Sequence, residues 1–212
     1  MLGGMSVSEL CVNLHDLVVI DKCVKVFDIF VAYTVTWLER SVAITKYPFE
    51  DDVRELISYL RSMYSLDKLK EDPIIRAYRD FFWRIGIDPT KVRPASEALV
   101  RRGLRGSFPR INPVVDAGNI ASAYTMVPIG MYDLDSVEPP FKITLSRGGE
   151  VFRPIGGRDE VLGKNIPILI DSKGIVMHIY PHRDSRDTCI SCLLYTSPSP
   201  RDLSTSRMPS SA

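Results

Sequence analysis

The stretch Ser107–Asp135, SFPRINPVVDAGNIASAYTMVPIGMYDLD, combines proline, glycine and side-chain amides more densely than an ordinary core segment does. Its prolines fix the backbone angle φ, whereas Gly118 and Gly130 allow another backbone or side chain to approach closely. A backbone stiffened in this way can hold several polar side chains near one point. We therefore expect a polar site in this stretch, with these candidate members: Arg110, Asn112, Asp116 and Asn119.

Helices are expected upstream of this stretch and within it. Phe49–Tyr64 carries apolar residues at helical spacing and acidic residues in its first turn, where negative charge suits the helix dipole. Asp72 is a good N-cap, and Pro73 suits the first position of a helix that ends near Ile85. Two more helices are expected, over Ala95–Leu104 and Val114–Tyr124.

One strand is expected near the N-terminus and several short strands after residue 141. Val24–Leu38 is rich in β-branched and aromatic residues, which favour strands. Glycine-containing turns separate the later strands, which are expected at Lys142–Ser146, Val151–Pro154, Pro167–Asp171 and Gly174–Tyr180. This order predicts an α+β fold in which the N-terminal strand and the helices pack on a C-terminal mixed or antiparallel sheet.

The end of the chain has a different character. Cys192–Ala212 is rich in serine and proline and has no apolar periodicity. CLLYTSPSPRD resembles the translation of a common transposon-based sequencing adapter, and SRMPSSA resembles its far end in the same reading frame. We therefore expect three parts: an N-terminal segment 1–46 that contains a strand and belongs to the same domain, a domain 47–191, and a non-native tail 192–212 that interrupts the natural product near Ser191.

Composition is that of a globular protein without excess charge. The apolar fraction is 45% and the charged fraction is 25%. Of the 27 basic and 26 acidic residues, the tail holds two and one, so the remainder is neutral. This balance does not indicate a DNA-binding protein. No segment reaches the ~18 consecutive apolar residues of a membrane span.

Cysteines and histidines give no metal motif. The natural cysteines are Cys11, Cys23 and Cys189. Their number is odd and their spacing fits no zinc site, which indicates reduced thiols and a cytoplasmic protein. One local concentration of charge remains, in Arg101, Arg102, Arg105 and Arg110. A solvated helix face is the simplest interpretation of that run.

The sequence contains no serine or cysteine nucleophile signature, no phosphate loop and no dinucleotide-binding fingerprint, so we expect no cofactor. The chemistry that its residues allow is attack of water on a bound ester, which needs donors for a developing oxyanion. The candidate donors are Asn112, Asn119 and the backbone amides near Gly156 and Gly157. Arg110 or Arg183 can hold a carboxyl, phosphate or ribose group. The alternative for both asparagines, and for Asp116, is a cap or turn role.

Two ordered motifs resemble a known family. PRINPVVDAGNI and GMYDLD are similar to R-P-I-N-N-V-V-D-x-T-N-Y and H-A-F-D-L-D of the B3/B4 tRNA-binding and editing domain in the bacterial phenylalanine-tRNA synthetase beta chain. Asp72–Glu97 and the segment YPHRDSRDT resemble the free-standing proteins of this family. The resemblance covers roughly Ala32 to Ile190, and no synthetase catalytic core accompanies it.

The resemblance assigns some site residues and removes others. Asn119 stands at the asparagine of T-N-Y, whereas Gly118 replaces the preceding threonine and Gly130 replaces the histidine of H-A-F-D. VMHIYPHRDS replaces a glycine-rich V-M-G-G-E segment, and its His178, His182, Arg183 and Asp184 offer substitute groups. The resulting catalytic candidates are Asn119, His182 and Asp184, with no metal. The substrate-binding candidates are Arg110, Asn112, Gly118, Gly130, Gly156, Gly157, Arg183 and Ser185.

Two functions from different classes follow from these residues. The resemblance implies a protein that binds aminoacylated tRNA in the cytoplasm and hydrolyses mischarged aminoacyl-tRNA in trans. The glycines at family side-chain positions and the neutral net charge favour instead a non-catalytic RNA- or amino-acid-binding module. A metabolic enzyme acting on a free amino acid has no motif behind it.

Overall fold

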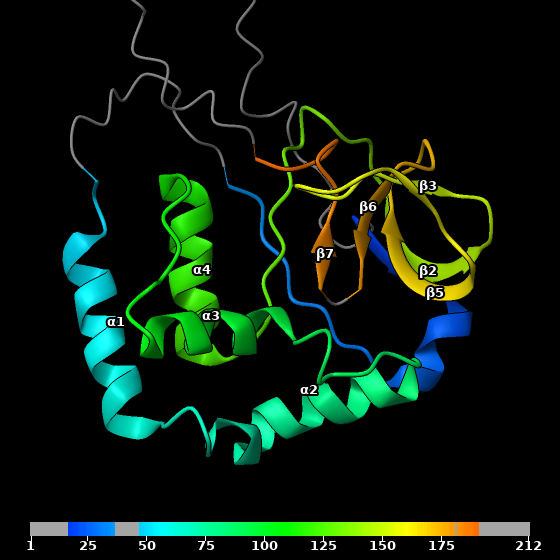
Figure 1. The fold of residues 1–212 in the computed structure, drawn as a ribbon. Coiled ribbons are helices and arrows are strands. Elements are labelled where there is room, and N and C mark those ends of the chain that lie inside the picture. The colour runs from blue at the N-terminus through cyan, green and yellow to red at the C-terminus, as the bar shows by residue number, and fades with distance from the viewer. Residues whose placement is uncertain (1–16, 37–46, 181, 191–212) are drawn as a thin grey trace, which may run out of the picture.

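The computed structural model describes residues 17–36, 47–180 and 182–190, and Figure 1 shows helices and a twisted sheet side by side. The helices are α1 (Glu50–Met63), α2 (Pro73–Arg84), α3 (Ala95–Leu104) and α4 (Pro113–Thr125), with short 3-10 turns η3 (Lys22–Phe27) and η4 (Leu69–Glu71). The strands are β1 (Val18–Ile20), β2 (Phe141–Arg147), β3 (Val151–Phe152), β4 (Glu160–Val161), β5 (Lys164–Ile170), β6 (Val176–Ile179) and β7 (Arg183–Asp184). The proposed adapter-derived tail lies outside the described residues.

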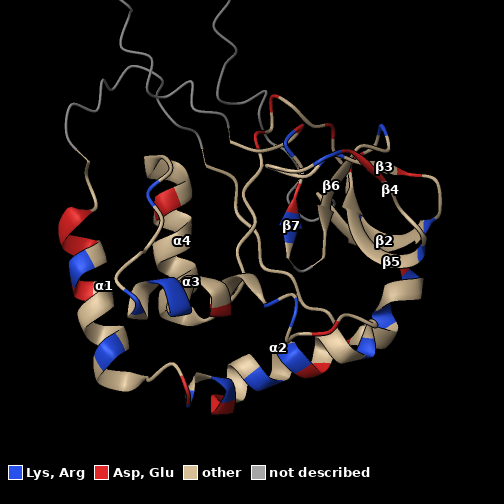
Figure 2. Cartoon of the chain, viewed as in Figure 1, with Lys and Arg blue, Asp and Glu red and all other residues tan. Residues whose placement is uncertain are grey.

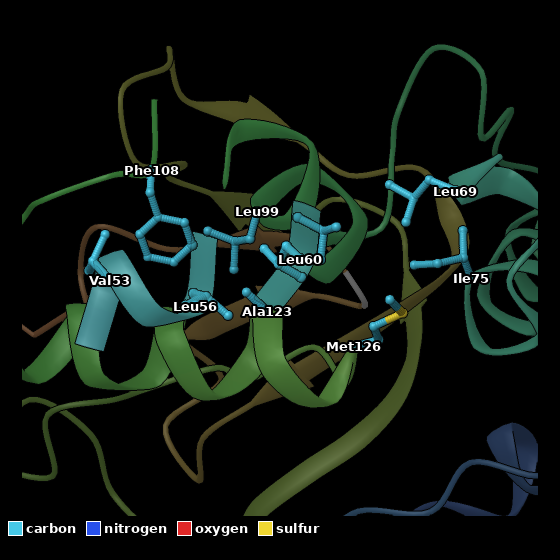
Figure 3. Close-up of a cluster of buried hydrophobic side chains, with 10 residues drawn as sticks. Val53, Leu56, Leu60, Leu69, Ile75, Leu99, Phe108, Ala123 and Met126 are labelled. Atoms are coloured by element: carbon cyan, nitrogen blue, oxygen red, sulfur yellow. The ribbon is translucent and has the colours of Figure 1, made fainter. Parts of the chain in front are cut away.

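The expected helices are confirmed, and two of them, α2 and α4, begin at a side-chain cap. The Asp72 carboxylate accepts hydrogen bonds from the backbone amides of Ile74 and Ile75, at 2.8 and 3.2 Å, and Pro73 follows it at the first helical position. Asn112 caps α4 in the same way by accepting from Val115 N at 2.9 Å. Figure 3 shows the apolar side chains of α1, α3 and α4 converging on one core, which includes Leu56, Leu60, Leu99 and Ala123.

The sheet is mixed, as the sequence predicts. Its strand order is β1-β2-β5-β6-β7, with β1 parallel to β2 and the other neighbours antiparallel. β3 and β4 form a separate antiparallel pair, and Phe152 of β3 packs in a buried cluster with Ile168 of β5 and Ile179 of β6. The fold is therefore α+β, with the helices preceding most of the sheet in the sequence.

The position predicted for the N-terminal strand was wrong. In the described part of Val24–Leu38, residues 24–27 belong to η3 and residues 28–36 contain no strand. The strand is β1 instead, which pairs with β2 through Val18 opposite Phe141. β-branched and aromatic residues favour strands when they pack on a half-buried face, and here Val26 and Phe30 are 68% and 91% exposed.

α2 spans the distance between the helical core and the sheet (Figure 1). Of its aromatic residues, Phe82 is fully buried, whereas Trp83 is 58% exposed. Consecutive helical residues point in directions about 100° apart, so they cannot all face the core. Phe81 contacts Tyr180 edge to face at 5.7 Å between ring centres, and Phe82 lies 5.7 Å from the His182 ring. α2 thus supports the turn that joins β6 to β7.

Candidate functional site

A polar cluster forms where β6 pairs with β7. His178 and Asp184 are directly opposite in the antiparallel register, so their side chains lie on the same face of the sheet. His178 Nδ1 lies 2.8 Å from Asp184 Oδ1. Tyr132, from the segment between α4 and β2, donates its hydroxyl to the same oxygen over 3.5 Å. The cluster therefore joins an imidazole, a carboxylate and a phenol.

The cluster has a defined electrostatic arrangement. Burial, followed by the negative charge of Asp184, raises the pKa of the Tyr132 phenol well above its ordinary value. Tyr132 is thus a neutral donor at physiological pH. In the neutral imidazole tautomer that donates from Nδ1 to Asp184, Nε2 is the acceptor. Among the described residues Nε2 has no hydrogen-bond partner.

The glycine turn predicted to supply backbone donors lies against β7. Ile155 donates its backbone amide to the Asp184 carbonyl over 3.1 Å, and Pro154 pairs with Ser185 in an isolated bridge. Gly156 has a φ of +72°, a conformation that glycine adopts without strain. The structure thus brings Gly156 and Gly157 beside the backbone of Asp184. Ser185 is fully buried, and its hydroxyl accepts from Asp187 N over 3.2 Å.

The two other polar residues of this hairpin face different neighbours. Arg183 pairs with Glu160 of β4, and its guanidinium lies 5.2 Å from the centre of the Phe152 ring. No ion pair joins Arg183 to Asp184 within the described residues, and Asp184 lies against His178 instead. Burial lowers the pKa of His182 to about 4, and its Nδ1 is buried with no partner among the described residues. His182 is therefore neutral at physiological pH.

Gly118 and Gly130 lie beneath two neighbouring side chains. A Cβ atom at Gly118 would lie 2.6 Å from the sulfur of Met131. A Cβ atom at Gly130 would lie 2.5 Å from the hydroxyl oxygen of Tyr132. The segment 130–132 thus spans from the middle of α4 to Asp184 on β7. The space that larger side chains would occupy at these two positions is filled by Met131 and Tyr132.

The candidates at the start of α4 form a separate group. Arg110 pairs with Glu50 of α1 at 2.8 Å and lies 5.2 Å from the centre of the Tyr47 ring. Asn112 is buried as the N-cap of α4, in agreement with its cap interpretation. The Asp116 carboxylate, also buried, accepts from Ile111 N at 2.9 and 3.1 Å, which confirms its cap role. None of these groups contacts the His178 cluster within the described chain.

Asn119 follows Gly118 on α4 and is partly exposed. Its amide has no hydrogen-bond partner among the described residues, and no hydrogen bond joins it to Asp184 there. Tyr132 is the residue that sequence reasoning missed. Its signal was present in GMYDLD, where a tyrosine replaces the phenylalanine of H-A-F-D-L-D and adds a hydroxyl group.

Other features of the described chain bear on the kind of site. Surface hollows lie on α3 and beside β2 and β5, and the residues that line these hollows do not include the His178 cluster. No group of three or more histidine, cysteine, aspartate or glutamate side chains is placed to hold a metal within residues 17–36, 47–180 and 182–190. No helix in this same part of the chain is long and apolar enough to span a bilayer.

Comparison with known proteins identifies the family of the chain. The model of the B3/4 domain family matches residues 77–192, from the middle of α2 to beyond β7. Among solved structures, the chain is similar to an N-terminal fragment of the phenylalanyl-tRNA synthetase beta-subunit from Pyrococcus horikoshii. That similarity has a TM-score of 0.33 and 19% identity, and covers 38% of this chain and 30% of the fragment. No curated protein matches the chain. The B3/B4 resemblance drawn from the sequence is confirmed, and because the family match extends over more than half of its length, the chain belongs to the B3/4 domain family.

Proposed function

We propose that this protein binds aminoacylated tRNA and hydrolyses the ester bond of a mischarged amino acid in trans, in the cytoplasm where tRNA is charged. The observation that carries the proposal is the His178–Asp184 pair at 2.8 Å beside the glycine turn 154–157. Membership of the B3/4 family supports tRNA as the partner, because the sequence motifs of the resemblance come from a tRNA-binding and editing domain.

The geometry supports a general-base mechanism. His178 Nε2 takes a proton from water while the water oxygen attacks the ester carbonyl, and Asp184 holds the imidazole through Nδ1. The resulting oxyanion needs donors, for which the backbone amide of Gly156 is the candidate in this turn, because Ile155 and Gly157 already donate to the carbonyls of Asp184 and Pro154. When the intermediate collapses, the carbonyl carbon–ribose oxygen bond breaks, and the imidazolium returns its proton to the ribose oxygen. Asn119 then lines the amino-acid pocket.

Hydrolysis of a panel of mischarged tRNAs tests this proposal. We expect the wild-type protein to deacylate at least one pair, and His178→Gln to lower kcat by roughly 10²–10⁴-fold. Asp184→Asn should also lower kcat, since it removes the carboxylate charge that stabilises the imidazolium and no longer enforces the tautomer with the proton on Nδ1. Glu55→Gln, at an exposed position of α1, is the matched control and should retain full activity. Wild-type hydrolysis no faster than the uncatalysed rate for every pair would contradict the proposal.

A non-catalytic binding module is the second candidate, and one observation favours it. Met131 covers Gly118 and Tyr132 covers Gly130, at the two positions where the family pattern has a threonine and a histidine. A pocket filled in this way retains less room for a reacting ester. This function predicts salt-dependent tRNA binding without turnover. Turnover that is lost in Asn119→Ala, in a protein that remains folded, would instead support editing.

A further inference from the structure

α3 carries a concentration of arginine that lies apart from the His178 cluster. A surface hollow of about 250 Å³ is lined by Arg93, Ala98, Arg101, Arg102 and Arg105. Figure 2 shows this basic run on α3 and in the turn that follows it. A helix dipole favours cations in the last turn, which accounts for Arg101 and Arg102. The same argument applies to Arg105 at the C-cap, but not to Arg93, which precedes the helix.

A buried carboxylate lies next to two arginines of this hollow, Arg93 and Arg101. Glu97 is completely buried and receives hydrogen bonds from Arg79 and Arg101, at 2.9 and 2.8 Å. Arg93 lies 3.9 Å from the same carboxylate. One negative charge therefore faces three positive charges, and the excess is positive. Because Arg101 also donates to the Leu66 carbonyl at 3.2 Å, its guanidinium is held in place before any ligand arrives.

Two guanidinium groups at the rim of the hollow form no ion pair within the described part of the chain. Arg102 and Arg105 are exposed, and neither side chain has an ion-pair partner among the described residues. Arg61 of α1 extends the same surface, since its guanidinium would lie 3.4 Å from a Cβ atom at Gly106. Arginine presents a planar fork of donors that matches the oxygens of a phosphate group.

We propose that the arginine hollow on α3, centred on Arg101, Arg102 and Arg105, binds the phosphate backbone of RNA. The inference rests on the proposed function in one respect: tRNA is then the natural RNA, and the hollow is its docking surface outside the reacting site. An acidic protein segment fits less well, because protein interfaces contain an apolar core and Ala98 is the only apolar residue lining this hollow.

The test compares two double variants that each remove two positive charges. Arg102→Gln/Arg105→Gln removes the unpaired rim of the hollow, and Lys22→Gln/Lys25→Gln removes exposed charges from η3 as the control. Binding of uncharged tRNA and of a single-stranded RNA is measured over a salt series, with a polyglutamate peptide as competitor. We expect the arginine variant to bind RNA roughly tenfold more weakly and to reduce the slope of log affinity against log salt by about 2.

Each outcome decides between the proposals. Wild-type RNA binding that the arginine variant retains at full strength would overturn this inference while the editing proposal stands. RNA binding lost with the arginines, in a protein that deacylates nothing, would support the inference and reject editing. If the control variant loses as much affinity for RNA as the arginine variant does, the hollow is not the RNA-binding site. Polyglutamate that displaces tRNA when its carboxylates are fewer than the phosphates of the RNA would show that the hollow prefers an acidic protein segment, and would overturn RNA as the ligand.

Discussion

Arg79 of α2 and Glu97 of α3 are joined by two parallel hydrogen bonds, from Nε and Nη2 to the two carboxylate oxygens, each 2.9 Å long. Glu97 is fully buried, whereas Arg79 is 20% exposed in its side chain. Charge-assisted pairs with this fork geometry are the strongest hydrogen bonds that side chains form. The pair fixes α2, which supports the β6–β7 turn, to α3, which carries the arginine hollow.

Replacing Glu97 should therefore destabilise the whole protein. Glu97→Gln leaves Arg79 and Arg101 facing each other without the charge that compensates them, and removing one partner of a buried pair costs about 3–5 kcal/mol. We expect a loss of about 3 kcal/mol in the free energy of unfolding, measured by urea denaturation at neutral pH. Glu55→Gln on α1 is the control and should change that free energy by less than about 0.5 kcal/mol. Equal midpoints for the two variants would show that the buried pair contributes nothing.

The contribution of Glu97 should disappear in acid. Burial raises the pKa of Glu97, but the hydrogen bonds from Arg79 and Arg101 outweigh it, so the pKa lies below the ordinary value of 4.5. A carboxyl with a lowered folded-state pKa stabilises the fold above its unfolded pKa, and this stabilisation is lost as the pH falls through the folded value. The difference in unfolding free energy between wild type and Glu97→Gln should thus be largest near neutrality and shrink below about pH 4.5. A difference that is constant from pH 7 to pH 3 would contradict this.

His182 should produce a second pH dependence at higher pH. Its pKa is lowered from 6.5 to about 4, mainly by burial and also by the nearby His178 and Arg183. The unfolded chain then takes up a proton near pH 6.5 and the folded chain only near pH 4, so stability falls as the pH decreases across this interval. Above pH 6.5 His182 contributes no pH dependence. We expect His182→Gln to flatten the decline in unfolding free energy between pH 6.5 and 4, as measured by denaturant melts. The same slope in wild type and variant would show that His182 protonates freely in the fold.

The helices could be predicted from the sequence because their signals are local. Asp72 and Pro73 start α2 by contacts within three residues, and the apolar spacing of α1 marks its buried face directly. β1 could not be located in this way. It consists of three residues that become a strand by pairing with β2, more than 120 positions later in the chain. Two-residue strands such as β7 are likewise defined by their partners rather than by their own composition.

The candidate site shows the same difference between local contacts and long-range contacts. The sequence pointed to Arg183 and Asp184 as candidates, but the opposition of His178 to Asp184 depends on the register of β6 and β7. The approach of Tyr132 to Asp184 joins residues 52 positions apart, and no local pattern encodes it. The cap roles of Asn112 and Asp116 are confirmed, since both bind backbone amides within five positions. Local chemistry was therefore predictable, whereas the assembly of the cluster required the fold.

The close packing of Tyr132 on Gly130 gives a final prediction, because it can be tested without knowing the substrate. A Cβ atom at position 130 would lie 2.5 Å from the hydroxyl oxygen and 3.0 Å from Cζ of Tyr132, so Gly130→Ala must displace the ring. Overpacking of this kind costs about 1–3 kcal/mol. In a Tyr132→Leu background the clash is absent, and the same substitution should cost less than about 0.5 kcal/mol. The double-mutant cycle should thus give a coupling energy above about 1 kcal/mol in urea denaturation.

Gly118→Ala is the matched control for this cycle. Its Cβ atom would meet the sulfur of Met131 at 2.6 Å, but a methionine side chain can move aside. Alanine also favours the helical conformation of α4 by up to ~1 kcal/mol over glycine. Gly118→Ala should therefore be nearly neutral, and Gly130→Ala should not. If both substitutions cost the same, or if the cost at Gly130 persists without the tyrosine ring, then Tyr132 does not occupy the space beside Gly130. The phenol would then be free to leave Asp184, and the cluster would reduce to the His178–Asp184 pair alone.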